Sequence, residues 1–225
     1  PALLRIREQI GAANSGGQPL CVRGGGTKEF YGQNPSGQLL STAEFTGIVS
    51  YEPTELVVSV RAGTLLAELN AALADQGQFL PFEPPAFGAQ STIGGVIAAG
   101  LSGPRRPSAG AARDFVLGAK LIDARGQWLA FGGQVMKNVA GYDVSRLQAG
   151  AMGTLGVMTE ISLKVLPKPA CTVTIAQDIS ANDAVQLMNQ RAGKAKPLTA
   201  ACWFDGKLYQ RLAGAQSAVE RTLKE

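Results

Sequence analysis

Glycine is the feature of this sequence that most limits what the chain can fold into. The 225 residues include 28 glycines, and they are concentrated in three runs at 24–26, 94–103 and 150–156. Glycine lacks a side chain and therefore tolerates backbone conformations and close approaches that other residues resist. Runs this far apart in the sequence suggest that the backbone approaches a ligand at several places.

The segments around these runs alternate between helical and strand patterns, which indicates an α+β fold. Apolar residues at helical spacing predict helices over 3–10 and 65–73. The β-branched run 56–60 predicts a central strand, and 155–165 a long amphipathic strand. Further strands are expected at 20–22, 39–40, 48–51, 115–122 and 128–131, with a rigid extended segment at 81–85 and a loop at 100–113.

A second unit is expected after the Pro-Lys-Pro run at 167–169, which is typical of a linker. The pattern that follows predicts the start of another α+β unit, made of strand 172–176, helix 183–192, strands 199–204 and 207–212, and helix 215–224. We therefore place one domain over 1–168 and the beginning of a second over 169–225.

Composition excludes several classes of protein. The net charge is +4, but the basic residues are scattered, so no nucleic-acid partner is expected. No apolar run is long enough for a transmembrane segment. The chain has no histidine, which removes the commonest general base and metal ligand, so we expect no metal site and chemistry that depends on a cofactor.

The three cysteines form no CxxC pair, which favours a disulfide-free cytoplasmic protein. Cys21 lies in a predicted core strand and is expected to serve packing.

The first glycine run directly follows a predicted strand. Gly24, Gly25 and Gly26 can turn several N–H groups toward one anion, with a positive φ expected at Gly25, while Thr27 adds a hydroxyl and Lys28 a charge. Residue 29 is not glycine and no glycine adjoins the lysine, so neither GxGxxG nor a Walker loop is present. This run therefore holds a pyrophosphate outside a Rossmann frame, or it is a plain turn between two strands.

Two later runs are further candidates. Ser91 and Thr92 precede Gly94 and Gly95 at an expected helix start, which suits a phosphate or a flat ring, or else tight packing of a small-residue helix on a sheet. The Gly-Thr-Leu-Gly-Val run at 153–157 could pair with an adenine edge, or form a turn. One extended ligand would explain all three runs.

Charged and aromatic residues near the later runs have two interpretations. Arg105 and Arg106 could bind a substrate carboxylate or stabilise an anionic cofactor, or they could be solvent-exposed loop charges. Lys137, Tyr142 and Asp143 could contact a cofactor, or Asp143 could cap a short helix.

The order of five runs resembles the FAD domain of the vanillyl-alcohol-oxidase family. They are Arg-Gly-Gly-Gly-Thr-Lys, Glu-Pro-Pro, Thr-Ile-Gly-Gly, Lys-Asn-Val-Ala-Gly-Tyr-Asp and Gly-Thr-Leu-Gly-Val. Within that family, the runs 103–107, 113–118 and 131–138 resemble the flavin subunits of bacterial glycolate oxidases. The resemblance implies a two-lobed PCMH-type FAD-binding domain, followed by an incomplete α+β cap domain that lacks the family's C-terminal third.

The resemblance also implies a cofactor and its contacts. FAD is expected without a covalent bond, because Thr27 stands where relatives with covalent flavin carry histidine. The implied cofactor contacts are Gly24, Gly25, Gly26, Thr27, Lys28, Pro85, Ser91, Thr92, Gly94, Gly95, Ser102, Gly103, Gly153, Gly156 and Val157. Arg105, Arg106 and Tyr142 are the implied substrate contacts.

By this resemblance, the parent enzyme oxidises glycolate or a related 2-hydroxy acid, with the flavin as hydride acceptor. Its partners would be a second flavin subunit and an iron–sulfur subunit, which could also hold it at the inner membrane. Without histidine or a complete cap, the 225-residue chain alone is expected to be inactive. Two alternatives stay open: a non-catalytic FAD-binding assembly or electron-relay subunit, and a non-flavin phosphate-binding module.

Overall fold

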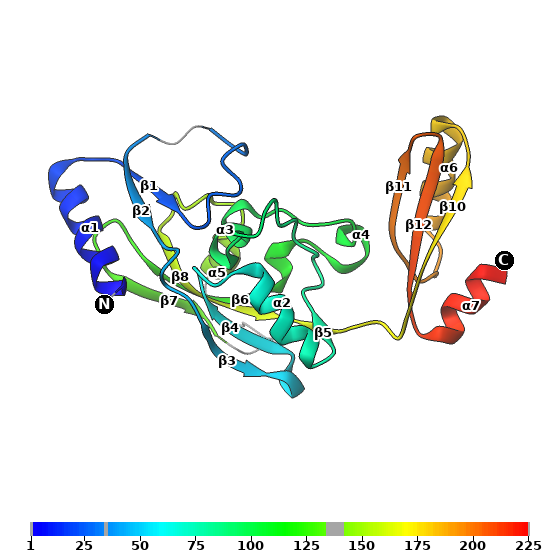
Figure 1. Ribbon diagram of the computed structural model, residues 1–225, viewed down its shortest axis with the longest axis horizontal. Coiled ribbons are helices and arrows are strands. Elements are labelled where there is room, and N and C mark those ends of the chain that lie inside the picture. Colours follow the sequence, from blue (N-terminus) through cyan, green and yellow to red (C-terminus); the bar gives the residue numbers. More distant parts are fainter. Residues whose placement is uncertain (1, 34–35, 134–141, 225) are drawn as a thin grey trace.

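A five-stranded antiparallel sheet, in the order β3-β4-β8-β6-β7, is the centre of the protein (Figure 1). The computed structural model describes residues 2–33, 36–133 and 142–224. The sheet strands are β3 (Ile48–Glu52), β4 (Val57–Arg61), β8 (Val157–Lys164), β6 (Val116–Ile122) and β7 (Trp128–Gly132).

Helices α2 (Leu66–Asp75) and α3 (Ile93–Ala99) bury their apolar side chains against one face of this sheet, in a cluster with Val58, Val60 and Ile161. Removing these side chains from water is the main favourable term that holds the two helices on the sheet. The interior position predicted for the strand at 56–60 is confirmed, because β4 pairs with β3 on one side and β8 on the other.

The strand predicted at 155–165 is present as β8, but the prediction that it is amphipathic is wrong. Side chains on both faces of β8 are buried: Ile161 is 0% exposed and its neighbour Ser162 is 9% exposed. Ser162 tolerates burial because its hydroxyl lies 2.7 Å from that of Ser59 on β4, and the two share a hydrogen bond.

A smaller lobe is formed by the N-terminal elements. They are α1 (Ala2–Gly16), β1 (Leu20–Arg23) and β2 (Gln38–Ser41), and β1 and β2 form a separate parallel pair. Ile6 and Ile10 of α1 share a buried cluster with Leu40, Ile122 and Val157, which joins this lobe to the large sheet. The expected α+β, two-lobed organisation is therefore present.

Short elements fill the connections. They are η1 (Pro53–Glu55), β5 (Gln78–Phe79), α4 (Arg106–Ala109), η2 (Ala112–Phe115), α5 (Val144–Leu147) and β9 (Leu166–Pro167). The loop expected at 100–113 thus contains a helical turn. The segment 81–85 is not uniformly extended, because Glu83 has φ 45° and its N–H donates to the carbonyl of Leu80 at 3.1 Å.

The C-terminal elements form a separate three-stranded antiparallel sheet in the order β10-β12-β11, on the right of Figure 1. They are β10 (Cys171–Asp178), α6 (Ala181–Ala192), β11 (Leu198–Phe204), β12 (Lys207–Gly214) and α7 (Gln216–Lys224). We call them the second unit. All five agree with the predicted elements to within a few residues.

The expected linker at 167–169 begins later than predicted. Leu166 and Pro167 pair with β5, and the N–H of Lys168 donates to the carbonyl of Gly77 at 2.7 Å. These hydrogen bonds hold the chain up to residue 168 against the part of the protein that contains the five-stranded sheet, which we call the first body below. None of the helices in the described ranges has the length and apolar character needed to cross a membrane.

Candidate functional site

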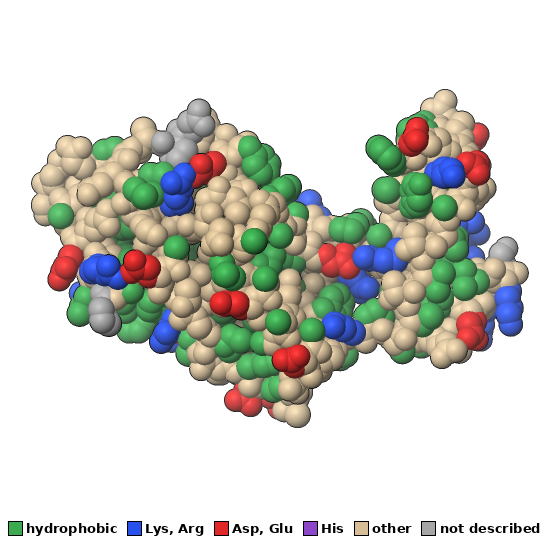
Figure 2. Space-filling model, in the orientation of Figure 1, with side chains coloured by type: hydrophobic (Ala, Val, Ile, Leu, Met, Phe, Trp, Pro, Cys, Tyr) green, Lys and Arg blue, Asp and Glu red, His purple; other side chains and the backbone are tan. Residues whose placement is uncertain are grey.

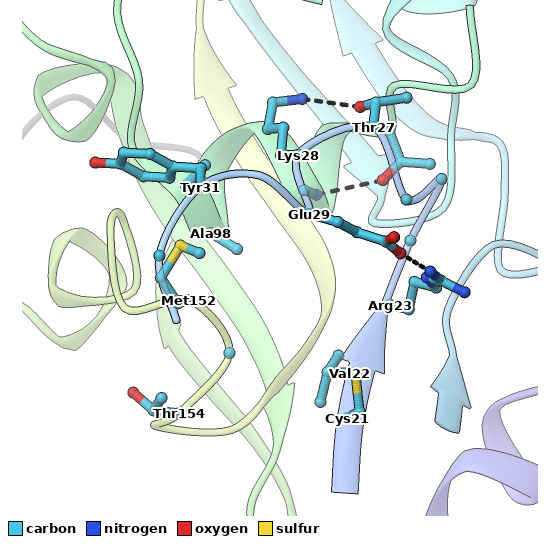
Figure 3. Close-up of a pocket in the computed structure, with 18 of the residues that line it drawn as sticks. Cys21, Val22, Arg23, Thr27, Lys28, Glu29, Tyr31, Ala98, Met152 and Thr154 are labelled. Carbon is cyan, nitrogen blue, oxygen red and sulfur yellow. Dashed lines mark hydrogen bonds and ion pairs between the residues drawn. The ribbon is translucent and has the colours of Figure 1, made fainter. Parts of the chain in front are cut away.

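A cavity of about 490 Å³ lies between β1, the loop that follows it, helix α3 and the turn at 152–154 (Figure 3). It brings together parts of all three glycine runs. The residues that line it are Leu20, Cys21, Val22, Arg23, Gly24, Gly25, Gly26, Thr27, Lys28, Glu29, Tyr31, Gly32, Gln33, Thr92, Gly95, Ala98, Ala99, Met152, Gly153 and Thr154.

Glycine is required at residues 25 and 26 for different reasons. A Cβ on Gly25 would lie 1.5 Å from the carbonyl oxygen of Gln90, so the two loops pack backbone to backbone. The positive φ expected at Gly25 is instead found at Gly26, whose φ is +68°. A side chain at residue 25 would therefore displace the loop at 88–91, rather than only fill the space of an anion.

Lys28 places a positive charge on the wall of this cavity. Its Nζ donates to Oγ of Ser91 at 2.8 Å and lies 5.9 Å from the centroid of the Phe87 ring. Partial burial lowers the pKa of Lys28 below its ordinary value. Lys28 has no ion-pair partner among the described residues, whereas Arg23 is paired with Glu29. This charge is therefore available to an anion in the cavity.

Helix α3 contributes a wall of small residues. Thr92 begins the helix, and its Oγ1 accepts a hydrogen bond from the N–H of Gly95 at 3.3 Å. Gly95 and Ala98 line the cavity, so a flat group could lie close to the helix backbone. A Cβ on Gly94 would instead lie 2.8 Å from Cβ of Ala62, which confirms the packing alternative for Gly94.

The other end of the cavity is largely apolar. It is lined by Cys21 and Val22 from β1 and by Met152 and Gly153 from the turn, as Figure 3 shows for the labelled side chains. Met152 has φ 53°, and its N–H donates to the carbonyl of Ala98 at 2.9 Å, which fixes the turn against α3. Cys21, which was expected to serve packing, also lines the cavity.

Several expected cofactor contacts do not line the cavity, although Ser91 is linked to it through Lys28. Val157 is buried beneath the small lobe, and the hydroxyl of Ser102 accepts a hydrogen bond from the N–H of Ala112 at 2.9 Å. Pro85, Gly103 and Gly156 also lie outside the lining.

The two arginines of the 100–113 loop have different environments. Nε of Arg105 lies 3.4 Å from Oε1 of Glu83, its guanidinium stacks 5.0 Å from the centroid of the Phe79 ring, and its side chain is 13% exposed. Exposed loop charge is therefore the wrong description of Arg105, but it fits Arg106, which is exposed.

Tyr142 is 96% exposed and lies outside the cavity lining. The carboxylate of Asp143 accepts a hydrogen bond from the N–H of Arg146 at 3.0 Å, so its predicted role as a helix cap is confirmed. Lys137 lies outside the described residues.

The cavity also contains residues that the sequence patterns did not indicate. Tyr31, Gln33 and Met152 line it because the chain after the glycine run folds back over α3 and meets the 152–154 turn. No local pattern identifies them. Repeated left-handed backbone at Gly26, Met152 and Gly153 is a signal of a constrained site, but it is visible only in the structure.

The cavity has an ammonium without an ion-pair partner in the described residues and glycine backbone in one part, and small and apolar side chains in another. Such a lining fits a dinucleotide with a charged diphosphate and flat rings. Residues 5–132 match the family model described as FAD binding domain, and the chain belongs to this family. The expectation of an FAD-binding fold and of FAD as cofactor is confirmed.

Two relatives narrow the similarity within this family to glycolate oxidase subunits. The chain is 46% identical to the glycolate oxidase subunit GlcE of Escherichia coli over 215 residues, which cover 96% of this chain and 61% of GlcE. It is 35% identical to the glycolate oxidase subunit GlcD of Bacillus subtilis over 159 residues, covering 70% of this chain and 34% of GlcD. The chain thus spans less than two thirds of the length of either relative.

The fold is also shared with a solved structure of alkyldihydroxyacetonephosphate synthase. The TM-score is 0.75 at 18% sequence identity, and the match covers 97% of this chain and 47% of that one. At this identity the similarity concerns the fold alone.

Proposed function

We propose that this chain forms the FAD-binding part of a glycolate oxidase subunit, in which FAD oxidises glycolate or a related 2-hydroxy acid. The observation that carries the proposal is the single cavity that gathers residues 20–33, 92–99 and 152–154 in a chain 46% identical to GlcE. We further propose that residues 1–168 are the FAD-binding domain and residues 169–225 the beginning of a second domain.

The proposed roles follow from the chemistry of the lining. The Lys28 ammonium and the N–H groups of residues 24–27 hold the diphosphate, since charge-assisted hydrogen bonds to oxyanions are among the strongest available. Gly95 and Ala98 admit the cofactor close to α3. When bound, FAD supplies the hydride acceptor, and the protein contributes position and electrostatics.

For the substrate, we propose Arg106 as the first candidate for carboxylate binding. Arg105 is held by Glu83, whereas Arg106 has no ion-pair partner among the described residues. Tyr142 is the second candidate; like Arg106, it is exposed and lies outside the cavity lining. Partner subunits, including a second flavin subunit and an iron–sulfur subunit, belong to the same proposal.

The second candidate function is a non-catalytic subunit that binds FAD for assembly or electron transfer. The sequence contains no histidine, and removal of the hydroxyl proton of a 2-hydroxy acid needs a base with a pKa near the working pH. Lys28 already serves the diphosphate in our proposal, so this second function assigns removal of the proton to residues outside this chain.

Anaerobic mixing with glycolate distinguishes the two functions. We expect the purified chain to show the absorption spectrum of bound flavin and to keep its colour for minutes with excess glycolate. We expect bleaching when the partner subunits or a longer chain are present. Bleaching of the 225-residue chain alone would show that it already holds a complete active site. A colourless preparation that takes up no added FAD would contradict the proposal.

A further inference from the structure

Glu83 is the point where the first body and the second unit are joined by charged side chains. Nη2 of Arg211, on β12, lies 2.8 Å from each carboxylate oxygen of Glu83. The same carboxylate accepts a hydrogen bond from the backbone N–H of Arg105 at 3.1 Å and lies near its Nε. Figure 2 shows acidic and basic side chains side by side where the two bodies meet.

The contacts of Glu83 with Arg105 and Arg211 are less exposed to solvent than a typical surface ion pair. The side chains of Arg105, Glu83 and Arg211 are 13%, 21% and 24% exposed, so water screens them only in part. Glu83 itself has a left-handed backbone, with φ 45°, which is unfavourable for a residue that carries a Cβ. Gly103 packs so closely that a Cβ on it would lie 2.2 Å from the Glu83 carbonyl oxygen. The surrounding contacts therefore fix the position of Glu83.

The chain that leaves Glu83 leads directly to the cavity. Pro84 and Pro85 restrict the backbone for the next two residues, and only about 10 Å of chain separates Glu83 from Ala86. Beyond them, Ser91 accepts a hydrogen bond from Nζ of Lys28 at 2.8 Å, and the carbonyl of Gln90 packs on Gly25. Segment 83–92 thus contacts the second unit at one end and the glycine loop at the other.

We propose that Arg211 is a positioning residue for the cofactor cavity, which acts through Glu83 on segment 83–92. A shift of Glu83 is transmitted by the two prolines to the backbone that supports Gly25 and Lys28. By linkage, docking of the second unit and binding of FAD then strengthen each other. This inference rests on the proposal that FAD occupies the cavity.

The test compares Arg211→Met with Lys207→Met. Both residues lie on β12, and both substitutions remove one positive charge and leave an unbranched side chain. Lys207 pairs with Asp178 inside the second unit, 3.9 Å away and well exposed, so it controls for charge and for the stability of that sheet. We expect R211M to raise the Kd for FAD, measured by quenching of flavin fluorescence, about five- to tenfold, a typical coupling between sites. K207M should bind like wild type.

Two further variants make the result specific. Arg211→Lys keeps a charge that can reach one carboxylate oxygen and should restore part of the affinity. Glu83→Gln removes the negative charge that Arg211 contacts, and it should raise the Kd for FAD as R211M does. Equal Kd values for R211M and K207M would overturn the inference, and so would a loss in E83Q without one in R211M.

A variant in the cavity itself separates this inference from the proposed site. If Lys28→Met weakens FAD binding and R211M does not, only the coupling fails. If K28M binds FAD as wild type does, the cavity is not the FAD site and both proposals fail.

Discussion

At the scale of single residues, Lys28 connects the electrostatics of the cavity to a measurable pH dependence. Burial lowers the pKa of its ammonium in the free protein, and a bound diphosphate would favour the charged form. FAD affinity should therefore be full below this lowered pKa and fall as the pH rises through it. Isothermal titration with FAD across neutral to alkaline pH measures this dependence.

The matched variant is Lys28→Arg, whose guanidinium stays charged over the whole range. Its affinity should vary less with pH than that of wild type, while Lys28→Met should lose about tenfold at neutral pH, in line with the loss of one hydrogen bond to a charged group. An identical pH profile in wild type and K28R would show that another group titrates.

The same residue affects the stability of the free protein. Because the folded pKa of Lys28 lies below its unfolded value, the unfolded chain binds more protons between the two. The contribution of Lys28 to the free energy of unfolding therefore rises with pH through that interval. Deprotonation of Lys28 at high pH therefore does not destabilise the folded protein. A loss of FAD affinity in this pH range cannot be attributed to unfolding caused by Lys28.

At the scale of elements, two adjacent glycines of α3 are expected to respond oppositely to alanine. A Cβ on Gly95 would meet only Oγ1 of Thr92, at 3.3 Å, and it would enter the cavity, whereas alanine favours a helix by about 1 kcal/mol over glycine. Gly95→Ala should therefore keep or raise the Tm while it weakens FAD binding.

Gly94→Ala is the control on the same helix. Its Cβ would press on Ala62, with its carbonyl oxygen at 2.9 Å, so the overpacking should cost about 1–3 kcal/mol of stability. Thermal unfolding with and without FAD separates the two effects. A G95A variant with unchanged FAD affinity would remove α3 from the cofactor site.

At the scale of the whole molecule, covalent binding of the flavin would require a nucleophilic side chain, histidine or cysteine, in the cavity. The chain has no histidine, and Cys171 lies in the second unit with Cys202, outside the cavity lining. Cys21 lines the cavity, at the end that the family resemblance assigns to adenine. We expect acid precipitation to leave all flavin in the supernatant for wild type and for Cys21→Ser alike. Yellow colour in the wild-type pellet, absent from the variant, would contradict non-covalent binding.

Much of the fold could be predicted because its elements follow local patterns. The hairpin of β6 and β7, the cap of α5 by Asp143 and the five elements of the second unit agree with the sequence. The predicted amphipathic character of β8 was wrong because distant segments cover both of its faces. The segment predicted to be extended at 81–85 instead begins with a turn at Pro81.

The sequence by itself determined the glycine runs, their order and therefore the family, since close approach of backbone to ligand leaves few alternatives to glycine. Only the tertiary structure decided which glycines face the cavity, because Gly94 and Gly95 are indistinguishable in a local pattern and differ by the side of the helix. It also decided the partners of Glu83, since Glu83 and Arg211 are 128 residues apart and meet only when the second unit docks. Contacts between distant segments depend on packing of the whole chain, which no local spacing encodes.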